Sequence, residues 1–483
     1  MLLPSWSALE TVLERYPWAQ ELAGILPLSA LIDFVDVPRR LHTYQLSGAT
    51  PLWCWPVTPS ASRLLVSEKT TDATCCLDRF GRSQGLTCLD GRYGDRYLTA
   101  NPETVRLCLS TAPRTVIRNT HDNMKRDNVR VHTLEVIRVS RAAPSTTRNV
   151  LLNAYTSAGW VLLAGLLAIG VLSESWLMTA FLVVVPLTGL VIRAIFGSSP
   201  RQLRISPPSD YNRLVVAASH MNETEWQVFY GESALVNSVL NWPLRSEHHS
   251  HTREGHGGSG GSGRVADLDG KSWTGWCWRQ ALRVLVLAQW ALAIGAATTK
   301  GWDAYGITFW IVLCIATNTY VFDPEGGARA WMRKHARLRL DVFVTRLSSR
   351  RALLNTVLAL NPDTFDAAGE GLAPGSLMWI DPVLHAGPSR SRWQEASRLA
   401  MLESRNKRGQ EPNPSEETVA AAQTEDWRGM YTDYWAREIP EGVEMAEKIT
   451  TEAGLTGRFV KQTTTKSAER EESVMGTSES CES

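Results

Sequence analysis

The chain has no excess of charge, because its 483 residues include 50 Lys and Arg against 49 Asp and Glu, a formal net charge of +1. A chain this balanced is not built as a whole to bind nucleic acid, which requires a basic surface. Cysteine is also scarce, and eight residues exclude a disulfide-dense secreted scaffold. Charged residues make up only 20% and hydrophobic residues 44%, which excludes a wholly disordered chain.

Signatures of common enzyme and cofactor sites are missing as well. The sequence contains no Walker loop, no dinucleotide-binding glycine fingerprint and no paired-histidine zinc helix. Residues Gly257 to Gly261 match the pattern of a nucleophile elbow, but they lie in a glycine-serine run that lacks the required strand and helix. His248, His249, His251 and His256 lie in the same linker, which offers no fixed backbone for a metal. The sequence therefore predicts no metal and no cofactor, and its catalytic residues, if any, stay unknown.

Isolated histidines and cysteines give only weak candidates. A catalytic dyad was sought among His42, His121, His132, His220 and His385, with Glu223 and Asp381 as neighbouring acids, and each is predicted to be a surface or hairpin residue. Cys54, Cys75, Cys76, Cys88 and Cys108 have no zinc-site spacing and are predicted to be reduced thiols, mostly packed in a core. Cys314 is predicted to serve packing within an apolar segment.

Two long blocks of the sequence are strongly apolar. In the first, Ala154 to Leu172 and Trp176 to Ile192 carry no charge and are separated by Ser173-Glu174-Ser175. In the second, Val284 to Thr299 and Ala304 to Phe322 are again uncharged. Because about 20 apolar residues in a helix cross a 30 Å hydrocarbon core, the blocks predict two transmembrane hairpins. The predicted fold is a membrane all-α bundle of four transmembrane helices plus a composite cytosolic α+β domain.

Basic residues predict how these spans are oriented. Arginines and lysines gather on the outer flanks of both hairpins, whereas the short turns hold only Glu174 in one case and Lys300 with Asp303 in the other. The positive-inside rule then places both termini and the long central loop in the cytosol of a multi-pass protein. Its expected partners are the lipid bilayer and proteins that bind the cytosolic domain.

The remaining sequence divides into regions by composition. They are 1–150 (N-terminal cytosolic α+β), 151–196 (first transmembrane hairpin), 197–280 (cytosolic loop with a ββα unit at 200–244 and a flexible His/Gly/Ser linker at 245–270), 281–322 (second hairpin), 323–405 (cytosolic helical region) and 406–483 (acidic, largely disordered tail). Within them, Tyr211 to His220 and Thr224 to Tyr230 predict strands, and Glu232 to Leu240 a short helix. Ala328 to Leu360 and Trp393 to Arg405 predict helices.

Several short segments stand out together: Arg213 to Ala217, Thr224 to Gln227, Asn237 to Pro243, Arg346 to Leu354, Trp379 to Pro382 and Arg392-Trp393. As a set, they resemble a group of filamentous-fungal integral membrane proteins of unknown function. The resemblance implies no activity or cofactor. Some fungal membrane proteins of this sort accompany gene clusters for secondary metabolism.

The sequence thus favours a membrane anchor or interaction platform with a cytosolic domain. A membrane-bound enzyme, possibly accessory to fungal secondary metabolism, is the alternative from another class. A small transporter is the third hypothesis. Transport pathways usually place ionisable residues within the bilayer, whereas these spans have none away from their ends, and Gln289, Asn318 and Thr319 are their main polar candidates.

Overall fold

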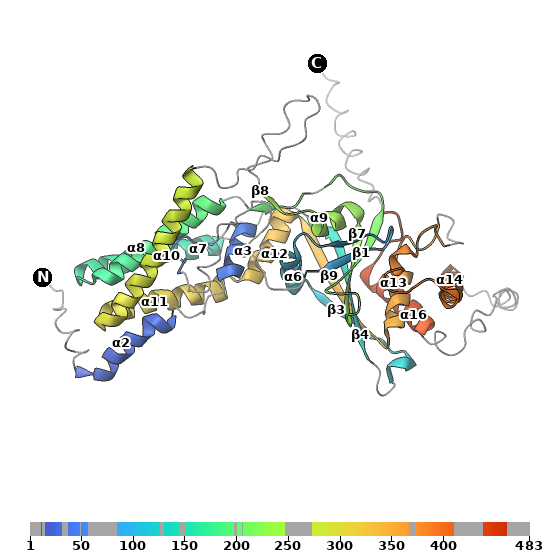
Figure 1. Cartoon of the computed structure of the whole chain (residues 1–483), viewed down its shortest axis with the longest axis horizontal. Coiled ribbons are helices and arrows are strands. Elements are labelled where there is room, and N and C mark those ends of the chain that lie inside the picture. The colour runs from blue at the N-terminus through green and yellow to red at the C-terminus, as the bar shows by residue number, and fades with distance from the viewer. Residues whose placement is uncertain are drawn as a thin grey trace, which may run out of the picture.

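The computed structural model describes residues 11, 15–30, 37–48, 50–56, 85–125, 130–143, 150–197, 200–204, 206–246, 273–366, 372–409 and 438–460. A helical bundle lies at one end, a sheet in the middle and further helices at the other end (Figure 1). The helices are α2 (Pro17–Ala30), α3 (Val37–Ser47), α6 (Pro102–Thr111), α7 (Val150–Leu172), α8 (Trp176–Phe196), α9 (Ser233–Leu240), α10 (Trp273–Thr299), α11 (Trp302–Ala316), α12 (Pro324–Trp331), α13 (Arg350–Leu360), α14 (Pro388–Gly409) and α16 (Glu438–Ala453). The strands are β1 (Thr87–Asp90), β2 (Arg96–Leu98), β3 (Arg114–Ile117), β4 (His132–Arg141), β5 (Arg201–Gln202), β6 (Asn212–Ala218), β7 (Glu225–Glu232), β8 (Arg245–Ser246) and β9 (Leu338–Leu347).

The bundle contains four helices that are long and apolar enough to cross a membrane. They are α7, α8, α10 and α11, the last continued by a π-helical turn to Val321, and they coincide with the apolar segments predicted from the sequence. Helix α8 packs against the other three, and α2 lies against α10 and α11. Asp303, in the first turn of α11, accepts a hydrogen bond from the backbone N–H of Met178 at 2.8 Å. This carboxylate satisfies one of the unpaired N–H groups at the start of α8 and so ties the two apolar blocks together.

A short non-helical segment, residues 50–56, lies inside this bundle. Trp53 and Trp55 are fully buried among the apolar helices, and glycines of α7 and α8 make room for them. The Gln289 side chain donates hydrogen bonds to the carbonyl of Trp55 (3.3 Å) and to the Thr188 hydroxyl (2.8 Å). Irregular backbone is stable in apolar surroundings only when its polar groups have such partners. The composition of 1–150 predicts that the whole region lies outside the apolar helices, whereas residues 53–55 are buried among them.

The sheet has seven strands in the order β2-β1-β6-β7-β4-β9-β3. The pairs β4–β7 and β3–β9 are parallel and the others antiparallel. Strands β1 to β4 come from region 1–150, β6 and β7 from region 197–280, and β9 from region 323–405. The predicted strands and short helix of the central loop are confirmed as β6, β7 and α9. Regions separated by the apolar helices therefore share one sheet, as the composite domain requires.

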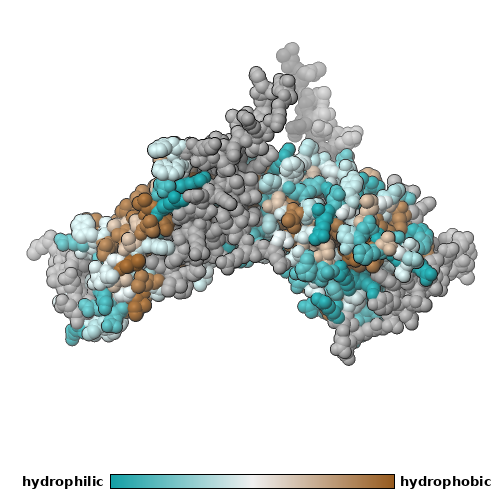
Figure 2. Space-filling model, in the orientation of Figure 1, coloured by the Kyte–Doolittle hydropathy of each residue, from teal (hydrophilic) through white to brown (hydrophobic). Residues whose placement is uncertain are grey.

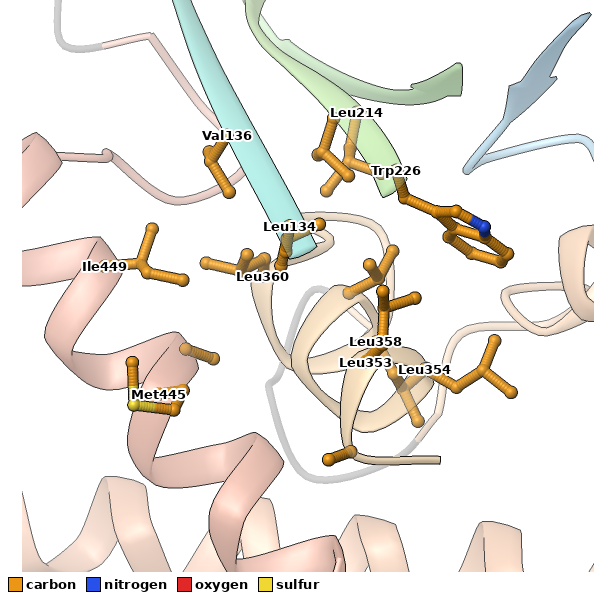
Figure 3. Packing of buried hydrophobic residues seen from close by; sticks show 14 of the residues in the cluster. Leu134, Val136, Leu214, Trp226, Leu353, Leu354, Leu358, Leu360, Met445 and Ile449 are labelled. Atoms are coloured by element: carbon orange, nitrogen blue, oxygen red, sulfur yellow. The ribbon is translucent and has the colours of Figure 1, made fainter. Parts of the chain in front are cut away.

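Helices cover both faces of the sheet, and alternation along the strands decides which side chains meet them. Leu134 and Val136 of β4 point to the face covered by α13, α14 and α16, where they join the cluster drawn in Figure 3. Ile137 and Val139 point to the opposite face, which α6, α9 and α12 cover. Side chains in a strand alternate between the two faces of the sheet. A strand that is buried on both faces therefore has apolar residues at both odd and even positions.

One predicted helix is wrong in its middle. The segment from Ala328 to Leu360 was expected to be helical and basic, but Leu338–Leu347 forms the long strand β9 beside β4. Its sequence LRLDVFVTRL contains the β-branched residues and the alternation typical of a strand, and it is flanked by true helices on both sides. Arg337, with a φ of 49°, ends the preceding helix in the left-handed conformation and starts the strand.

The predicted disorder of 406–483 is also wrong in part, because α16 packs on the sheet. Ile439, Met445 and Ile449 are buried in the same cluster as α13. Burying each such side chain stabilises the fold by about 1.5–3 kcal/mol, which outweighs the polar composition of the segment. Residues beyond the helix also join the sheet region, since Tyr211 and Phe459 form a bridge. Residues 410–437 and 461–483, including the aromatic stretch from Trp427 to Trp435, lie outside the described residues.

Candidate functional site

A polar cleft of about 260 Å³ opens at the end of the sheet farthest from the helical bundle. It lies where β4 begins, where β9 ends and where α13 and α16 both start. It is lined by Asn123, Arg130, His132, Ser348, Ser349, Arg350 and Glu438. Of the two cavities that stand out among the described residues, this one is polar, whereas the other is an apolar void of about 20 Å³ between α6, α9 and β9.

His132 is the first residue of β4, and it lies on the same face of the strand as Leu134 and Val136. Leu134 and Val136 lie in the apolar core, and His132 replaces the next apolar side chain at the cleft. The residue is only 7% exposed, yet its Nδ1 atom has no hydrogen-bond partner. Desolvation, with Arg130 and Arg350 nearby, lowers its pKa below the usual value, so the imidazole is neutral at physiological pH.

The start of α13 forms a second wall of the cleft. Ser349 is the N-cap residue, and its hydroxyl oxygen accepts a hydrogen bond from the Ala352 N–H at 3.1 Å. The Arg350 guanidinium donates to the Asn222 side chain at 2.8 Å and to the Met221 carbonyl at 2.9 Å. Both acceptors are neutral, so the positive charge of Arg350 is oriented but not neutralised by them.

Glu441 fixes the floor beneath the cleft. Its carboxylate is fully buried and accepts hydrogen bonds from Asn119 (2.8 Å), Asn123 (3.1 Å) and the Ser348 N–H (2.8 Å), and also from the Ser348 hydroxyl. These donors follow β3 and β9 or lie in the 3-10 turn Asp122–Lys125. The Glu441 carboxylate therefore holds together the loops at this edge of the sheet. Both of its oxygens already accept hydrogen bonds from these loops.

The structure brings one of the histidines considered in the sequence to this cleft and separates the rest. His42 is buried and contacts Thr104 at 3.1 Å, and burial lowers its pKa to about 3. His121 accepts a weak hydrogen bond from the Asn123 N–H within a turn. His220 closes the turn between β6 and β7, where Glu223 accepts from the Ser219 N–H instead of pairing with it. His385 is exposed, and Asp381 forms its ion pair with Arg390.

The cysteines that the structure describes lie in separate parts of the fold. Among the residues that the structure describes, no group of three or more metal-binding side chains occurs. Cys54, Cys88, Cys108, Cys277 and Cys314 are free thiols, and Cys54 lies in the bundle beside Cys314 rather than with Cys88 and Cys108. Cys75, Cys76, the linker histidines from His248 to His256 and the segment from Gly257 to Gly261 lie outside the described residues.

The polar residues predicted inside the apolar segments have structural partners. Gln289 holds the irregular segment, as described above. The Asn318 side-chain oxygen accepts from the Cys54 thiol at 3.6 Å, and the Thr319 hydroxyl donates to the Ile315 carbonyl within its own helix. Each of these groups stabilises the packing of the bundle or the helix itself.

A buried ion pair stabilises the other side of the sheet. Arg213 of β6 donates to both carboxylate oxygens of Asp90, at 3.0 and 2.6 Å, and to the Asn237 side chain at 2.7 Å. Asp90 is fully buried and also caps the turn after β1. The pair joins β1, β6 and α9, and its groups are fully occupied by one another.

No family model, curated protein or solved structure matches this chain. The resemblance to fungal membrane proteins therefore stays a prediction. The cleft was missed in the sequence because its lining comes from four separate segments and forms no contiguous motif.

Proposed function

We propose that the protein is a multi-pass membrane anchor that presents the α+β domain in the cytosol as an interaction platform. The observation that carries this proposal is the exposure of apolar side chains along the four long helices. Val161, Val284 and Leu287, for example, are 74%, 65% and 62% exposed in the folded chain. Figure 2 shows hydrophobic residues gathered on the lobe formed by the bundle, whereas the sheet lobe is mostly hydrophilic.

Contact with lipid explains this exposure better than contact with water. Soluble monomers rarely expose apolar patches beyond a few hundred Å², and burial of apolar area is worth about 25 cal/mol per Å². Helices of 20 to 25 residues also match the thickness of a hydrocarbon core. A bilayer would cover the faces that the fold leaves open.

The connections of the helices support a single orientation. The strands join the helices at one end of the bundle, where β4 leads to α7, α8 leads to β5 and the helix after α11 leads to β9. Basic residues flank this end, namely Arg141, Arg193, Arg201, Arg204, Arg279, Arg283, Arg329, Arg333 and Lys334. The positive-inside rule favours the cytosol for it. Among the described residues, the opposite end holds the short turns at Glu174 and Lys300, and α2 packs beside the Lys300 turn, where Gly24 faces Lys300 and the Tyr305 hydroxyl donates to the Ala19 carbonyl.

Arginine at an exposed position of the bundle tests contact with lipid. We expect Val161→Arg to impair insertion, because a charge at the centre of a spanning helix costs about 2.5–3.5 kcal/mol on translocon scales. Val116→Arg is the matched control, since Val116 is 72% exposed on β3, outside the apolar helices. In water both changes would be nearly neutral. Equal abundance of the two variants in the membrane fraction would contradict the proposal.

Glycosylation mapping tests the orientation. Asn222-Glu223-Thr224 is an acceptor sequence, and Asn222 is exposed in the turn between β6 and β7. We expect Asn222 to stay unmodified in eukaryotic cells, because the cytosol lacks the glycosylation machinery. An acceptor placed in a lengthened turn around Glu174 should be modified and serves as the positive control. A mass shift removed by endoglycosidase and abolished by Asn222→Gln would reverse the orientation.

A membrane-bound enzyme is the second candidate, and the cleft favours it. His132, Arg130 and Arg350 converge there from separate segments, which is the arrangement expected of a binding pocket. A small transporter finds less support, because Gln289 and Asn318 have structural partners.

A further inference from the structure

The lining of the polar cleft is suited to an anion. Arg130 and Arg350 contribute two positive charges, and no carboxylate among the described residues forms a salt bridge with either. Glu438 contributes one negative charge and His132 is neutral, so the lining carries 2 − 1 = +1. The lining therefore has a net positive charge.

Backbone dipoles add to this charge. Helices α13 and α16, of 11 and 16 residues, both begin at the cleft. The N-terminus of a helix has a partial positive charge and unpaired N–H groups that bind phosphate well. In α13 the Ser349 oxygen satisfies the Ala352 N–H, and Arg350, which lines the cleft, is the first residue of the helix.

His132 provides a second, independent observation. A buried polar atom without a partner loses its hydration without compensation, so its place in the structure calls for an explanation. The Nδ1 atom of His132 is such an atom, and the residue lines the cleft. A ligand oxygen would supply the missing hydrogen bond.

We propose that this cleft binds the phosphoryl group of a small, soluble phosphate monoester. Arg130 and Arg350 neutralise the phosphate, the start of α13 donates backbone hydrogen bonds to it, and His132 contacts one of its oxygens. Glu438 accepts a hydrogen bond from a hydroxyl group of the ester. The volume of about 260 Å³ lies just below the range of drug-sized pockets, which fits a phosphate with a few carbon atoms.

The position of the cleft favours a soluble ligand over a lipid headgroup. His132 begins β4, and Arg141 ends it on the side of the helical bundle. Ten residues of strand span roughly 30 Å, so the cleft lies far from any lipid around the bundle. The site belongs to the sheet domain, and failure of its test would leave the membrane proposal untouched.

Titration calorimetry on the full chain in detergent micelles tests the proposal, with glycerol 3-phosphate and inorganic phosphate as probes. We expect saturable binding of both, with the ester bound more tightly, and much weaker binding of acetate at equal ionic strength. Arg130→Met should weaken binding about tenfold, because it removes one charge-assisted contact. Arg130 is exposed, so we expect this variant to keep the fold.

Two further variants make the result specific. His132→Phe keeps a ring in the same place but removes Nδ1, and it should also weaken binding. Arg96→Met removes an exposed arginine from β2, at the opposite edge of the sheet, and should leave binding unchanged. Absence of saturable binding, equal affinity of Arg130→Met and the unchanged chain, or binding of inorganic phosphate more tightly than the ester would overturn the proposal.

Discussion

Replacement of Gly189 by leucine is expected to disrupt the helical bundle. A Cβ atom at this position of α8 would lie 2.2 Å from the Leu52 carbonyl oxygen and 2.8 Å from the Trp55 ring. Residues 50–56 would have to leave their place between the helices, and the buried tryptophans would lose their contacts. Losing a buried tryptophan typically costs about 3–5 kcal/mol. We therefore expect a large fall in thermal stability in detergent and little full-length protein in the membrane fraction.

Gly165→Leu is the matched control in the neighbouring helix α7. Nothing lies within 4 Å of a Cβ atom at Gly165, so the added side chain points into open space. Both substitutions raise helix propensity by about 1 kcal/mol, so a difference between them reports only the packing around the substituted glycine. Gly159→Leu should behave like Gly189→Leu, because its Cβ would lie 2.1 Å from the Trp53 ring. Equal stability of the Gly165 and Gly189 variants would show that residues 50–56 do not pack in the bundle.

The apolar helices were predictable because composition and length alone define them. A run such as Trp176 to Ile192 has one structural solution that satisfies every backbone group without water, which is a helix. The segment at 50–56 was not predictable in the same way. Its side chains are apolar, but its position depends on three residues of the folded helices. Gly159 and Gly189 leave space for it, and Gln289 donates a hydrogen bond to its backbone.

In the sheet, prediction succeeded where strands were separated by clear turn residues. The turn at Met221 to Glu223 divides β6 from β7, and both strands were placed correctly. Strand β9 lies between two basic helices, and the average composition of that region concealed its alternating pattern. Helix α16 was missed for a related reason, since its apolar residues recur at helical spacing within a segment that is acidic overall.

The candidate site could not be assembled from the sequence. Its arginines lie at positions 130 and 350, and only the antiparallel pairing of β4 with β9 brings them together. His132 was considered as one histidine among five, without a neighbour that distinguished it. Contacts between residues so far apart in the chain are fixed by sheet register, which local patterns do not reveal.

The second large effect is expected at the buried ion pair, where Arg213→Met should destabilise the sheet domain by about 3–5 kcal/mol. Methionine has a similar length, but it leaves the Asp90 carboxylate fully buried without its positive partner. It also removes the hydrogen bond to Asn237 of α9. For a domain of this size each kcal/mol shifts the melting temperature by about 2–4 °C, so the transition should fall by roughly 10 °C.

Arg141→Met provides the control, because Arg141 forms the same two-point contact with a carboxylate at the surface. It donates to both oxygens of Glu232, at 3.1 and 2.9 Å, but its side chain is 43% exposed. Water screens this pair and solvates Glu232 when the arginine is removed, so the loss should be within about 1 kcal/mol. The contrast between the variants reports mainly on burial, since both arginines make a two-point contact with a carboxylate and Arg213 differs by its burial and its added hydrogen bond to Asn237. If Arg141→Met lowered the melting temperature as much as Arg213→Met, the stability of the pair would come from its contacts alone and not from the desolvation of Asp90.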